Sequence, residues 1–583
     1  MFSSMRLVEC VPNISEGRRD AIIDDIVKAA AIEQVEVLGV DRGRSTNRTV
    51  ITFVAPPDKA QAAAFNLIKR ASELIDMRGH KGEHPRLGAT DVCPFVPLEG
   101  TTMEECVALA RRLGAQVWEE LKIPVYLYGE AAAAPERRSL AYLRQGEYEG
   151  IPRKLKDPKM APDFGEPVFN EKSGITVIGA RPFLIAYNIN LNTRNKKPAQ
   201  EIAVKIRESG AKKKDASGNF VLNDQGEAII EPGIFKCCAA VGWFIEEFGI
   251  AQVSINLTDF RVTSIEAVFD AVCRLAEERG LRVTGSEIVG LVPKQALLQA
   301  GCHYLKKQKA TLGIPEQDIY HIAARSLGLN DLYPFKIKDK VIEEKIKVEG
   351  KLVNSTLSAF ADSLSRDTPA PGGGSVSALA GSLAAGLVAM VSALTFAKVQ
   401  DTDDASRIEL EQLGIEAQKL KDALLKAVDE DTAAFDKVMA AFRTKAGSEE
   451  EKTLKERKII EAYKEAAGVP LEVAGNCLAA LKLAAKVLEI GLVSAFSDSA
   501  VSAQMAYAGL LGASYNVKIN LRELRQKSAL NAGDRNFLQT TATELEKRLA
   551  EGEGLISFIN SHIAQTLSDK NNLKEEICMN QTS

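Results

Sequence analysis

Two of the five histidines in the chain, His80 and His84, stand four residues apart in one short segment. Imidazole is the side chain whose ordinary pKa lies near neutrality, so this pair points to proton transfer or to metal binding. The segment fits H-x-x-E-H, an inverted zinc-protease motif that needs both histidines on one face of a helix. Gly79, Gly82 and Pro85 disfavour a helix here, and no third ligand is evident. Proton transfer is therefore favoured over zinc, while a surface loop with two solvated histidines remains open.

A carboxylate that could serve such an imidazole is Asp41, at the start of a predicted loop over residues 41–47. A carboxylate beside a histidine orients the ring and raises its pKa. An aspartate that only caps a turn is the alternative, and the sequence alone prefers it.

The elements around these residues alternate between short β-rich runs and amphipathic helices. Apolar periodicity predicts strands over 7–11, 35–40, 49–54, 91–96 and 124–128, and helices over 20–31, 59–75 and 103–121. A second round predicts strands over 183–191, 239–246, 252–257 and 282–288, and helices over 198–208, 265–279 and 294–307. Both rounds contain the order β-α-β-β-α-β, which predicts two ferredoxin-like α/β subdomains with helices on one face of each sheet. Within the second round, Asp224, Gln225 and Gly226 predict the turn of a surface hairpin inside residues 211–235.

The last third of the chain differs in composition, because it is rich in Ala and Leu and poor in proline. Residues 405–442, 449–488 and 523–563 are helix-rich, so a separate all-α bundle is expected. The predicted domains are 1–181 and 182–328, a charged and partly helical linker over 329–353, and the all-α domain over 354–583.

Composition limits the class of protein. The net charge of -4 argues against a dedicated nucleic-acid binder. Nine cysteines without framework spacing, and a start without a signal-peptide core, are typical of reduced thiols in a cytoplasmic protein. Residues 372–396 carry no charge and are long enough to cross a membrane, but their Ala, Ser and Gly content favours a buried helix of a bundle.

Several ungapped blocks, in order, resemble known enzymes over nearly the whole chain. The first half resembles glutamate formimidoyltransferases, and the helical part resembles formimidoyltetrahydrofolate cyclodeaminases. The transferase-like blocks are residues 8–13, 15–17, 45–50, 82–86, 91–95, 126–130 and 179–181. The cyclodeaminase-like blocks are residues 371–375, 429–431 with Phe435, and 497–498. The order of the two halves is similar to that of bifunctional formimidoyltransferase-cyclodeaminases.

The resemblance implies that His84 is the catalytic histidine of a formimidoyl transfer from N-formimidoyl-L-glutamate to tetrahydrofolate. It places Asp41 at an acidic position near that histidine, where it would orient the ring or stabilise its cation. His80 would support His84 without touching the substrate, or it would face solvent. The resemblance also implies that folate contacts one glycine-containing stretch, which without it would be interpreted as a domain connection. The residues of this stretch are Gly165, Glu166, Pro167, Val168, Phe169, Asn170, Glu171, Lys172, Ser173 and Gly174.

For the second reaction, the resemblance implies that Asp431 is the acid/base that closes the folate ring to 5,10-methenyltetrahydrofolate and releases ammonia. Three adjacent acids, Asp429 to Asp431, would otherwise indicate a solvated helix face. Just before a predicted helix, one short loop would offer free N–H groups to an anion or folate, or would only cap the helix. Its residues are Gly372, Gly373, Gly374 and Ser375.

The sequence therefore predicts a cytoplasmic bifunctional folate enzyme of histidine degradation. We expect tetrahydrofolate, with or without a polyglutamate tail, as co-substrate, and no metal, nucleic acid or membrane span. The resemblance further implies a homo-oligomer, with a ring-shaped octamer as its form. The alternatives are a glutamate formyltransferase in the N-terminal half, or a zinc hydrolase built on His80 and His84.

Overall fold

The computed structural model describes residues 6–44, 46–82, 84–98, 100–215, 219–346, 350–400 and 402–568. These residues form two compact units. The first unit holds the described residues up to His303 and those from Tyr320 to 346, and the second holds Tyr304–Ile319 and those from 350 onward. The predicted α/β region followed by a helical region is confirmed.

The first unit contains a seven-stranded sheet. Its strands are β1 (Val8–Cys10), β2 (Asn13–Ile14), β3 (Glu36–Gly43), β4 (Arg48–Ala55), β5 (Thr90–Pro97), β6 (Val125–Gly129) and β7 (Thr176–Ala180). β1 and β2 follow each other between β4 and β5, because both pair antiparallel with those two strands. β3 pairs with the outer edge of β4, and β7 and β6 extend the sheet in parallel beyond β5.

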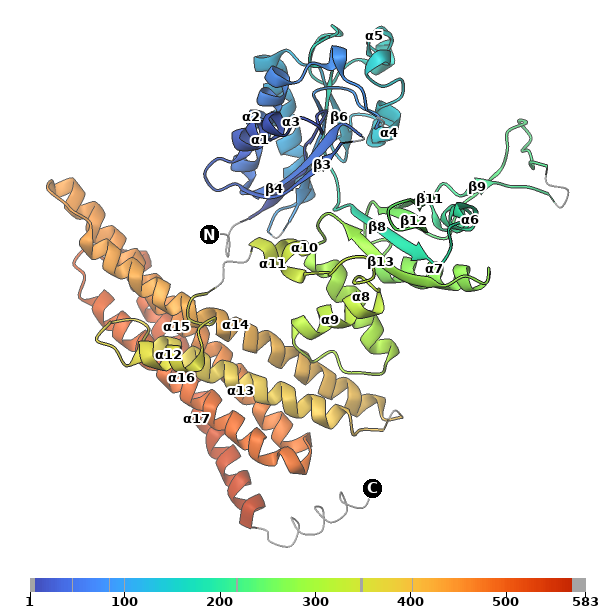
Figure 1. The fold of residues 1–583 in the computed structure, drawn as a ribbon. Helices are drawn as coiled ribbons and strands as arrows, with labels where there is room; N and C mark the ends of the chain where they lie inside the picture. Colours follow the sequence, from blue (N-terminus) through green and yellow to red (C-terminus); the bar gives the residue numbers. More distant parts are fainter. Residues whose placement is uncertain are drawn as a thin grey trace. The chain divides into compact units, whose positions relative to one another are not determined.

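Three helices cover one face of this sheet (Figure 1), and we call the opposite face, which these three do not cover, the free face. They are α1 (Asp20–Ala30), α2 (Pro57–Leu74) and α3 (Met103–Leu121). Because successive residues of a strand point to opposite faces, Val8 and Cys10 of β1 are buried beneath the helices while Glu9 faces the other way. The free face is therefore lined by the alternate residues of the central strands.

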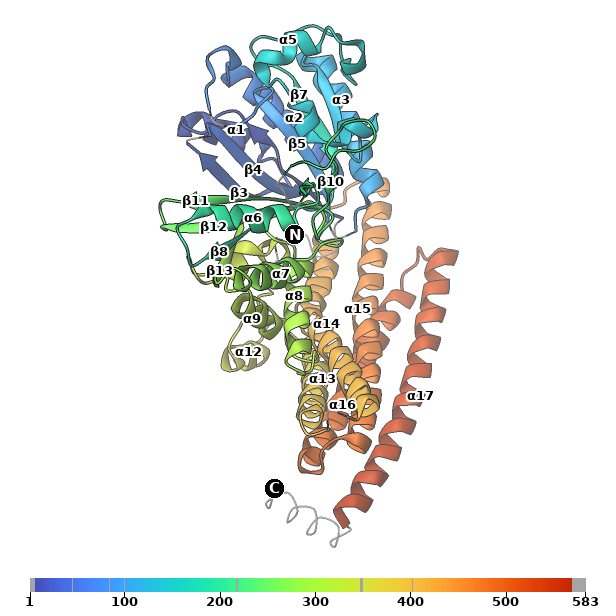
Figure 2. The same ribbon diagram turned by 90° about the vertical axis from the view of Figure 1, so that its right-hand side faces the viewer.

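A second, four-stranded sheet completes the first unit, with the antiparallel order β11-β12-β8-β13. Its strands are β8 (Ile185–Leu191), β11 (Cys238–Ile245), β12 (Ile250–Leu257) and β13 (Val283–Val289). α6 (Lys196–Ile206) and α7 (Ile265–Glu277) pack on one face of this sheet (Figure 2). After β13 come α8 (Lys294–Lys307), α9 (Glu316–Ser326), α10 (Ile337–Lys340) and α11 (Ile342–Ile346).

The predicted surface hairpin is also confirmed within its described residues. β9 (Ala211–Lys212) pairs with β10 (Ile230–Glu231), and Asn223 and Glu227 close the turn around Gly226 at φ +79°. The predicted loop over 41–47 needs a correction, because β3 continues to Gly43 and places Asp41 inside a strand opposite Val50.

The second unit is a helical bundle. Its long helices are α13 (Gly373–Phe396), α14 (Asp404–Arg443), α15 (Glu449–Ile490), α16 (Phe496–Arg525) and α17 (Ala532–Ser568), preceded by α12 (Leu357–Leu364). α13, α14, α15 and α16 pack against one another, and α17 lies along α15 and α16 (Figure 2).

Among the described residues, α13 is the one helix long and apolar enough to cross a membrane, with a mean hydropathy of 1.9. More than half of its apolar window, 56%, is buried within the bundle. Ala, Gly and Ser recur along its buried face, which lets the neighbouring helices approach closely. Packing against α14 and α16 thus accounts for the buried part of this apolar helix.

Candidate functional site

The free face of the first sheet forms the floor of a cleft of about 940 Å³, with residues of the second sheet on its other side. The cleft combines apolar walls with charged and hydrogen-bonding groups. These polar residues are Glu9, Asn13, Asp41, Arg48, Thr52, His84, Tyr128, Arg144, Arg181, Asn256, Glu287, Tyr333, Asp339, Lys340 and Lys345. A cleft of this size, in which polar groups converge from several strands between apolar walls, is the usual form of a small-molecule site.

His84 enters the cleft from the loop between a short 3-10 turn, η1 (Met77–Gly79), and β5. Its Nδ1 lies 2.7 Å from the carbonyl oxygen of Pro85. Because a carbonyl can only accept, Nδ1 carries the proton and Nε2 is the unprotonated, basic nitrogen. The ring is therefore held in the tautomer that a general base requires.

Burial and positive charge keep this imidazole neutral. Partial burial lowers the pKa of His84 below 6.5, and the nearby guanidinium groups of Arg48 and Arg144 lower it further. The Pro85 contact and the charge of Asp91 act in the opposite direction but are weaker.

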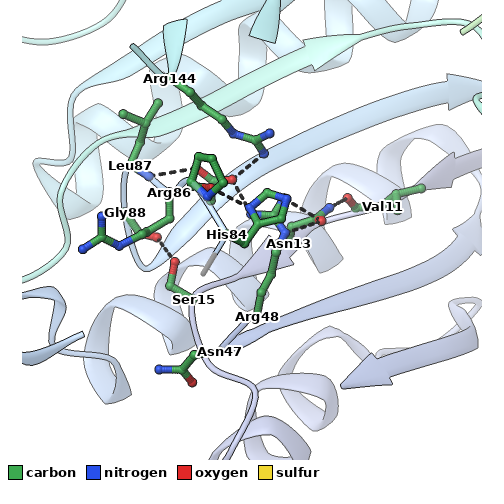
Figure 3. Close-up of polar contacts among 12 residues, drawn as sticks. Val11, Asn13, Ser15, Asn47, Arg48, His84, Arg86, Leu87, Gly88 and Arg144 are labelled. Atoms are coloured by element: carbon green, nitrogen blue, oxygen red, sulfur yellow. Dashed lines mark hydrogen bonds and ion pairs between the residues drawn. The ribbon is translucent and has the colours of Figure 1, made fainter. Parts of the chain in front are cut away.

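Arg48 and Arg144 converge on Asp91, a fully buried carboxylate. Figure 3 shows the two arginines together with His84. Arg144 lies 2.6 Å from Oδ2 of Asp91, and Arg48 contacts the same oxygen while also donating to Oδ1 of Asn13 at 2.8 Å. Burial alone would raise the pKa of Asp91, but the two guanidinium groups outweigh it and hold that pKa below its ordinary value. Two cations share one carboxylate, so surplus positive charge remains beside His84.

His80 differs from His84 in the contacts of its ring nitrogens. Its Nε2 lies 2.9 Å from the carbonyl oxygen of Asn47, and its Nδ1 accepts from Nε of Arg86 at 3.3 Å. Both ring nitrogens are thus engaged with the protein, which leaves the zinc alternative without its second histidine. Among the described residues, which exclude Glu83, no group of three or more His, Cys, Asp and Glu side chains is arranged to hold a metal.

Asp41 lines the same cleft from the edge of the floor. Cross-strand partners run from Asp41 to Val50 and from Val50 to Asn13, so two strand spacings of about 4.8 Å each separate Asp41 from the strand beside His84. No hydrogen bond or ion pair joins Asp41 to His84 within the described part of the chain. The structure brings the two residues to one cleft without direct contact.

The stretch from Gly165 to Gly174 does not line this cleft. Its end lies behind the loop that carries His84: Ala89 donates to the Ser173 carbonyl, and a Cβ on Gly174 would lie 2.1 Å from the Leu87 oxygen. Phe169 packs against Tyr148 with ring centroids 5.4 Å apart. The contacts of this stretch within the chain therefore support the loop from outside the cleft.

Most polar residues of the cleft were given no role by the sequence analysis, among them Glu9, Tyr128, Arg144 and Arg181. Arg144 belongs to no motif, whereas Glu9, Tyr128 and Arg181 stand inside family-like blocks. The signal that could have found Glu9 is a single acid in an apolar strand, on the face opposite Val8 and Cys10.

A second candidate site lies in the helical unit, where the start of α13 meets the middle of α14. Ser375 is fully buried and donates to the Val428 carbonyl at 2.8 Å, and its hydroxyl also lies 3.4 Å from Oδ2 of Asp431. Burial raises the pKa of Asp431, and Ser375 opposes this only in part. A Cβ on Gly374 would lie 2.0 Å from Oδ1 of Asp431, so only glycine fits beside this carboxyl. Gly372 is the N-cap of α13 and Gly373 its first residue, so the predicted loop is the start of this helix.

The other two acids of this cluster have structural contacts. Asp429 accepts from the backbone N–H groups of Leu352 and Val353 at 2.9 and 3.2 Å. Glu430 pairs with Lys426 at 2.8 Å on the exposed side of α14. The Asp431 carboxyl lies instead against Gly374 and Ser375 at the start of α13.

Comparisons with known proteins match three consecutive parts of the chain. The family described as "Formiminotransferase domain, N-terminal subdomain" matches residues 7–181, "Formiminotransferase domain" matches 186–347, and "Formiminotransferase-cyclodeaminase" matches 356–536. A formimidoyltransferase-cyclodeaminase of Gallus gallus is 42% identical over 531 residues, 89% of this chain and 93% of the relative.

Shorter relatives match the two parts separately. A glutamate formimidoyltransferase of Thermoplasma acidophilum is 46% identical over 307 residues, 52% of this chain and 93% of the relative. A methenyltetrahydrofolate cyclohydrolase of Methylorubrum extorquens is 35% identical over 219 residues, 38% of this chain and 99% of the relative.

Proposed function

The chain belongs to the formimidoyltransferase-cyclodeaminase family, and on that premise we propose that its two units catalyse consecutive folate reactions of histidine degradation. The first unit transfers the formimidoyl group of N-formimidoyl-L-glutamate to tetrahydrofolate. The helical unit then closes the product to 5,10-methenyltetrahydrofolate and releases ammonia. The observation that carries this proposal is the neutral His84, with its free Nε2 beside surplus arginine charge.

In the transfer, N5 of tetrahydrofolate attacks the formimidoyl carbon and forms a C–N bond. Nε2 of His84 accepts the proton that N5 loses and returns it to the glutamate nitrogen as the old C–N bond breaks. A base that is neutral at physiological pH can act in both halves of this exchange. The positive charge that Asp91 leaves uncompensated on Arg48 and Arg144 binds a carboxylate of the glutamate donor.

In the cyclisation, N10 of the folate attacks the same carbon and ammonia leaves. The formimidoyl nitrogen enters in its protonated form. Asp431 is the group proposed to take the proton from N10 and deliver it to that nitrogen, which then departs as ammonia and leaves the methenyl cation. Its raised pKa supports this exchange, because a carboxyl that is easier to protonate is a better proton carrier near neutrality. Ser375 holds the carboxyl in place.

Neither step as written requires a metal, and tetrahydrofolate is co-substrate of the first and carrier of the intermediate to the second. Folate contact by Gly165–Gly174 and a charge-stabilising role for Asp41 remain proposals. Asp41 faces the cleft, which supports a role through bound substrate. A second function for Gly373 and Gly374, holding a folate carboxylate at the start of α13, is likewise proposed.

At the level of fold and assembly, we propose the ferredoxin-like class for both subdomains and a cytoplasmic homo-oligomer with a ring-shaped octamer as its form. The strand order β11-β12-β8-β13 supports the first point. Exposed apolar side chains of α13 and α16, such as Leu383 (52% exposed), Val501 (52%) and Tyr515 (63%), support pairing of helical units between subunits.

The assignment is tested by separating the two activities in the full-length chain. His84→Ala should lower kcat/KM for glutamate release by about 10²- to 10⁴-fold, the usual contribution of general acid–base catalysis. It should leave ring closure of supplied 5-formimidoyltetrahydrofolate unchanged. Asp431→Asn should do the reverse. His321→Ala, on the surface of α9, and Glu430→Gln are the matched controls, and full transferase activity in His84→Ala would refute the assignment.

A further inference from the structure

Glu9 is a buried acid with no hydrogen-bond or ion-pair partner among the residues that the structure describes. It is 2% exposed, lies in the middle of β1 and faces the cleft. Within the described part of the chain, no hydrogen bond or ion pair reaches its carboxylate. Burying an ionisable group without a partner is costly, so such a group inside a binding cleft points to a ligand that supplies the missing donors.

The electrostatic surroundings of Glu9 agree with this. Burial raises its pKa to about 7, the charge of Arg181 lowers it in part, and Glu343 raises it further. Arg181 directs Nη1 to the Pro182 carbonyl at 3.0 Å and acts on Glu9 only at longer range. A ligand that donates hydrogen bonds would favour the ionised carboxylate.

The position of Glu9 on the cleft floor limits what that ligand can be. The cleft is lined from β1 and β2, which follow each other, by Glu9, Val11 and Asn13. Glu9 precedes Asn13 by four residues, which is about 13 Å along the backbone at about 3.3 Å per residue. His84 lies at the Asn13 end, because Arg48 both bonds Asn13 and acts on the pKa of His84. This spacing along the backbone is of the same order as a fused two-ring heterocycle with a hydrogen bond of about 3 Å at each end.

The pterin ring of tetrahydrofolate meets this requirement. Its N3–H and 2-amino group form a planar pair of donors, and a carboxylate accepts such a pair through two parallel hydrogen bonds. The reacting N5 belongs to the other ring, toward His84. The apolar side chains of Val11, Pro94 and Phe183 line the cleft beside the acid and would pack on the ring faces.

We propose that Glu9 is the residue that recognises the pterin of tetrahydrofolate, by accepting hydrogen bonds from N3–H and the 2-amino group while N5 faces His84. The proposal rests on the function proposed above and adds to it the orientation of the co-substrate. The formimidoyl group of the donor is also a planar set of donors. Its carbon must react beside His84, however, at the far end of the span from Glu9.

The test measures binding rather than turnover, so that it stands apart from the transfer reaction. The full-length chain, its Glu9→Gln variant and a control, Glu130→Gln at the exposed end of β6, are titrated with tetrahydrofolate and with a 2-desamino-2-methyl analogue. All three proteins also carry Asp431→Asn, which removes ring closure in the other unit. Competition with formimidoyl-glutamate identifies binding in the first unit.

The wild-type cleft and the Glu130→Gln control should bind tetrahydrofolate at least about tenfold more tightly than the analogue, because hydrogen bonds to a charged group are lost with the amino group. Glu9→Gln should bind tetrahydrofolate at least about tenfold more weakly and should discriminate less than about threefold between the two ligands. Equal discrimination in Glu9→Gln and wild type would overturn the proposal.

A stability measurement separates recognition from a structural role. Because the folded-state pKa of Glu9 lies above its unfolded value, its ionisation lowers stability as pH rises through about 7. Glu9→Gln should therefore melt at the same temperature as the wild type at pH 8, or higher. A lower melting temperature, with both ligands weakened equally, would show that Glu9 holds the fold. If the wild type released no glutamate but still bound tetrahydrofolate more tightly than the analogue, the proposed function would be refuted and the role of Glu9 in pterin recognition would not.

Discussion

The imidazole of His84 is held in one tautomer by a hydrogen bond and kept neutral by burial and by the charge of two arginines. The Pro85 carbonyl holds the proton on Nδ1, while burial and two guanidinium groups oppose a second proton on Nε2. The two ring nitrogens of His80, four residues earlier, both form hydrogen bonds, one with Asn47 and one with Arg86. The two histidines that the sequence presents as a pair thus have different contacts, and we propose that His84 is the base and His80 a positioning residue.

The pH dependence of transfer follows from the charge state of His84. A neutral base is needed and its pKa lies below 6.5, so kcat/KM for glutamate release should fall on the acid side only below the ordinary histidine range. Arg144→Gln removes one of the two cations, so the acid limb should move to higher pH and KM for formimidoyl-glutamate should rise. Arg138→Gln, which loses only an exposed pair with Glu130, is the control. A pH profile unchanged by Arg144→Gln would contradict this account of the pKa.

At the scale of elements, the loop before β5 is held on both sides. Asn47, at φ +50°, accepts from the Gly17 N–H and donates to the Lys81 carbonyl, each at 3.0 Å. The Ser15 hydroxyl donates to the Gly88 carbonyl at 2.7 Å. Residues far apart in sequence therefore set the position of His84, and family-like blocks at 15–17 and 45–50 have a structural meaning.

Much of this element list is predictable from periodicity alone. The helices Met103–Leu121 and Lys294–Lys307 have the predicted bounds, because capping residues and apolar faces are local signals. β7 was missed as an element, since a short apolar run beside the expected domain boundary carries no alternation. The helix-rich stretch 523–563 contains a break, and α17 begins only at Ala532, after Asn531 accepts from the Asp534 N–H.

The candidate sites were predictable only where a motif carried them. His84 and Asp431 could be found from sequence, whereas the roles of Arg144 and Glu9 depend on which strands lie side by side. Local periodicity shows that Glu9 points away from the helices. It does not show that a second sheet encloses that face, so Glu9 has the sequence signature of a solvated residue.

The start of α13 provides a test of the second site at this scale. Gly374→Ala would place a Cβ 2.0 Å from Oδ1 of Asp431 and displace the carboxyl. Overpacking of about 1–3 kcal/mol should lower ring closure at least about tenfold and leave glutamate release unchanged. Gly386→Ala on the same helix meets nothing within 4 Å and should keep both activities. Normal ring closure in Gly374→Ala would argue against Asp431 as the acid/base.

The neighbouring acids provide a test of structure rather than chemistry. Asp429 ties Leu352 and Val353 to α14 through two charge-assisted hydrogen bonds, so Asp429→Ala should cost about 2 kcal/mol. The melting transition of the helical unit should fall by about 4–8 °C. Glu430→Ala removes an exposed ion pair worth less than about 1 kcal/mol and should shift it little. Calorimetry of the full chain measures both, and equal shifts would disprove the proposed difference.

At the scale of the whole molecule, the chain consists of two units with separate hydrophobic cores and separate candidate sites. The cleft with His84 is built by two sheets, and the Asp431 site by the crossing of α13 and α14. Each unit alone also has relatives that match it over almost their full length. The central claim is therefore that one chain carries out two reactions in order on the same folate.

One reaction mixture tests that claim most directly. The full-length protein is supplied with formimidoyl-glutamate and tetrahydrofolate, and glutamate, ammonia and methenyltetrahydrofolate absorbance are followed together. We predict equal amounts of all three, with formyl-glutamate in place of formimidoyl-glutamate giving no ammonia and far less glutamate. Absence of glutamate release, or release of glutamate from formyl-glutamate at the higher rate, would contradict the account.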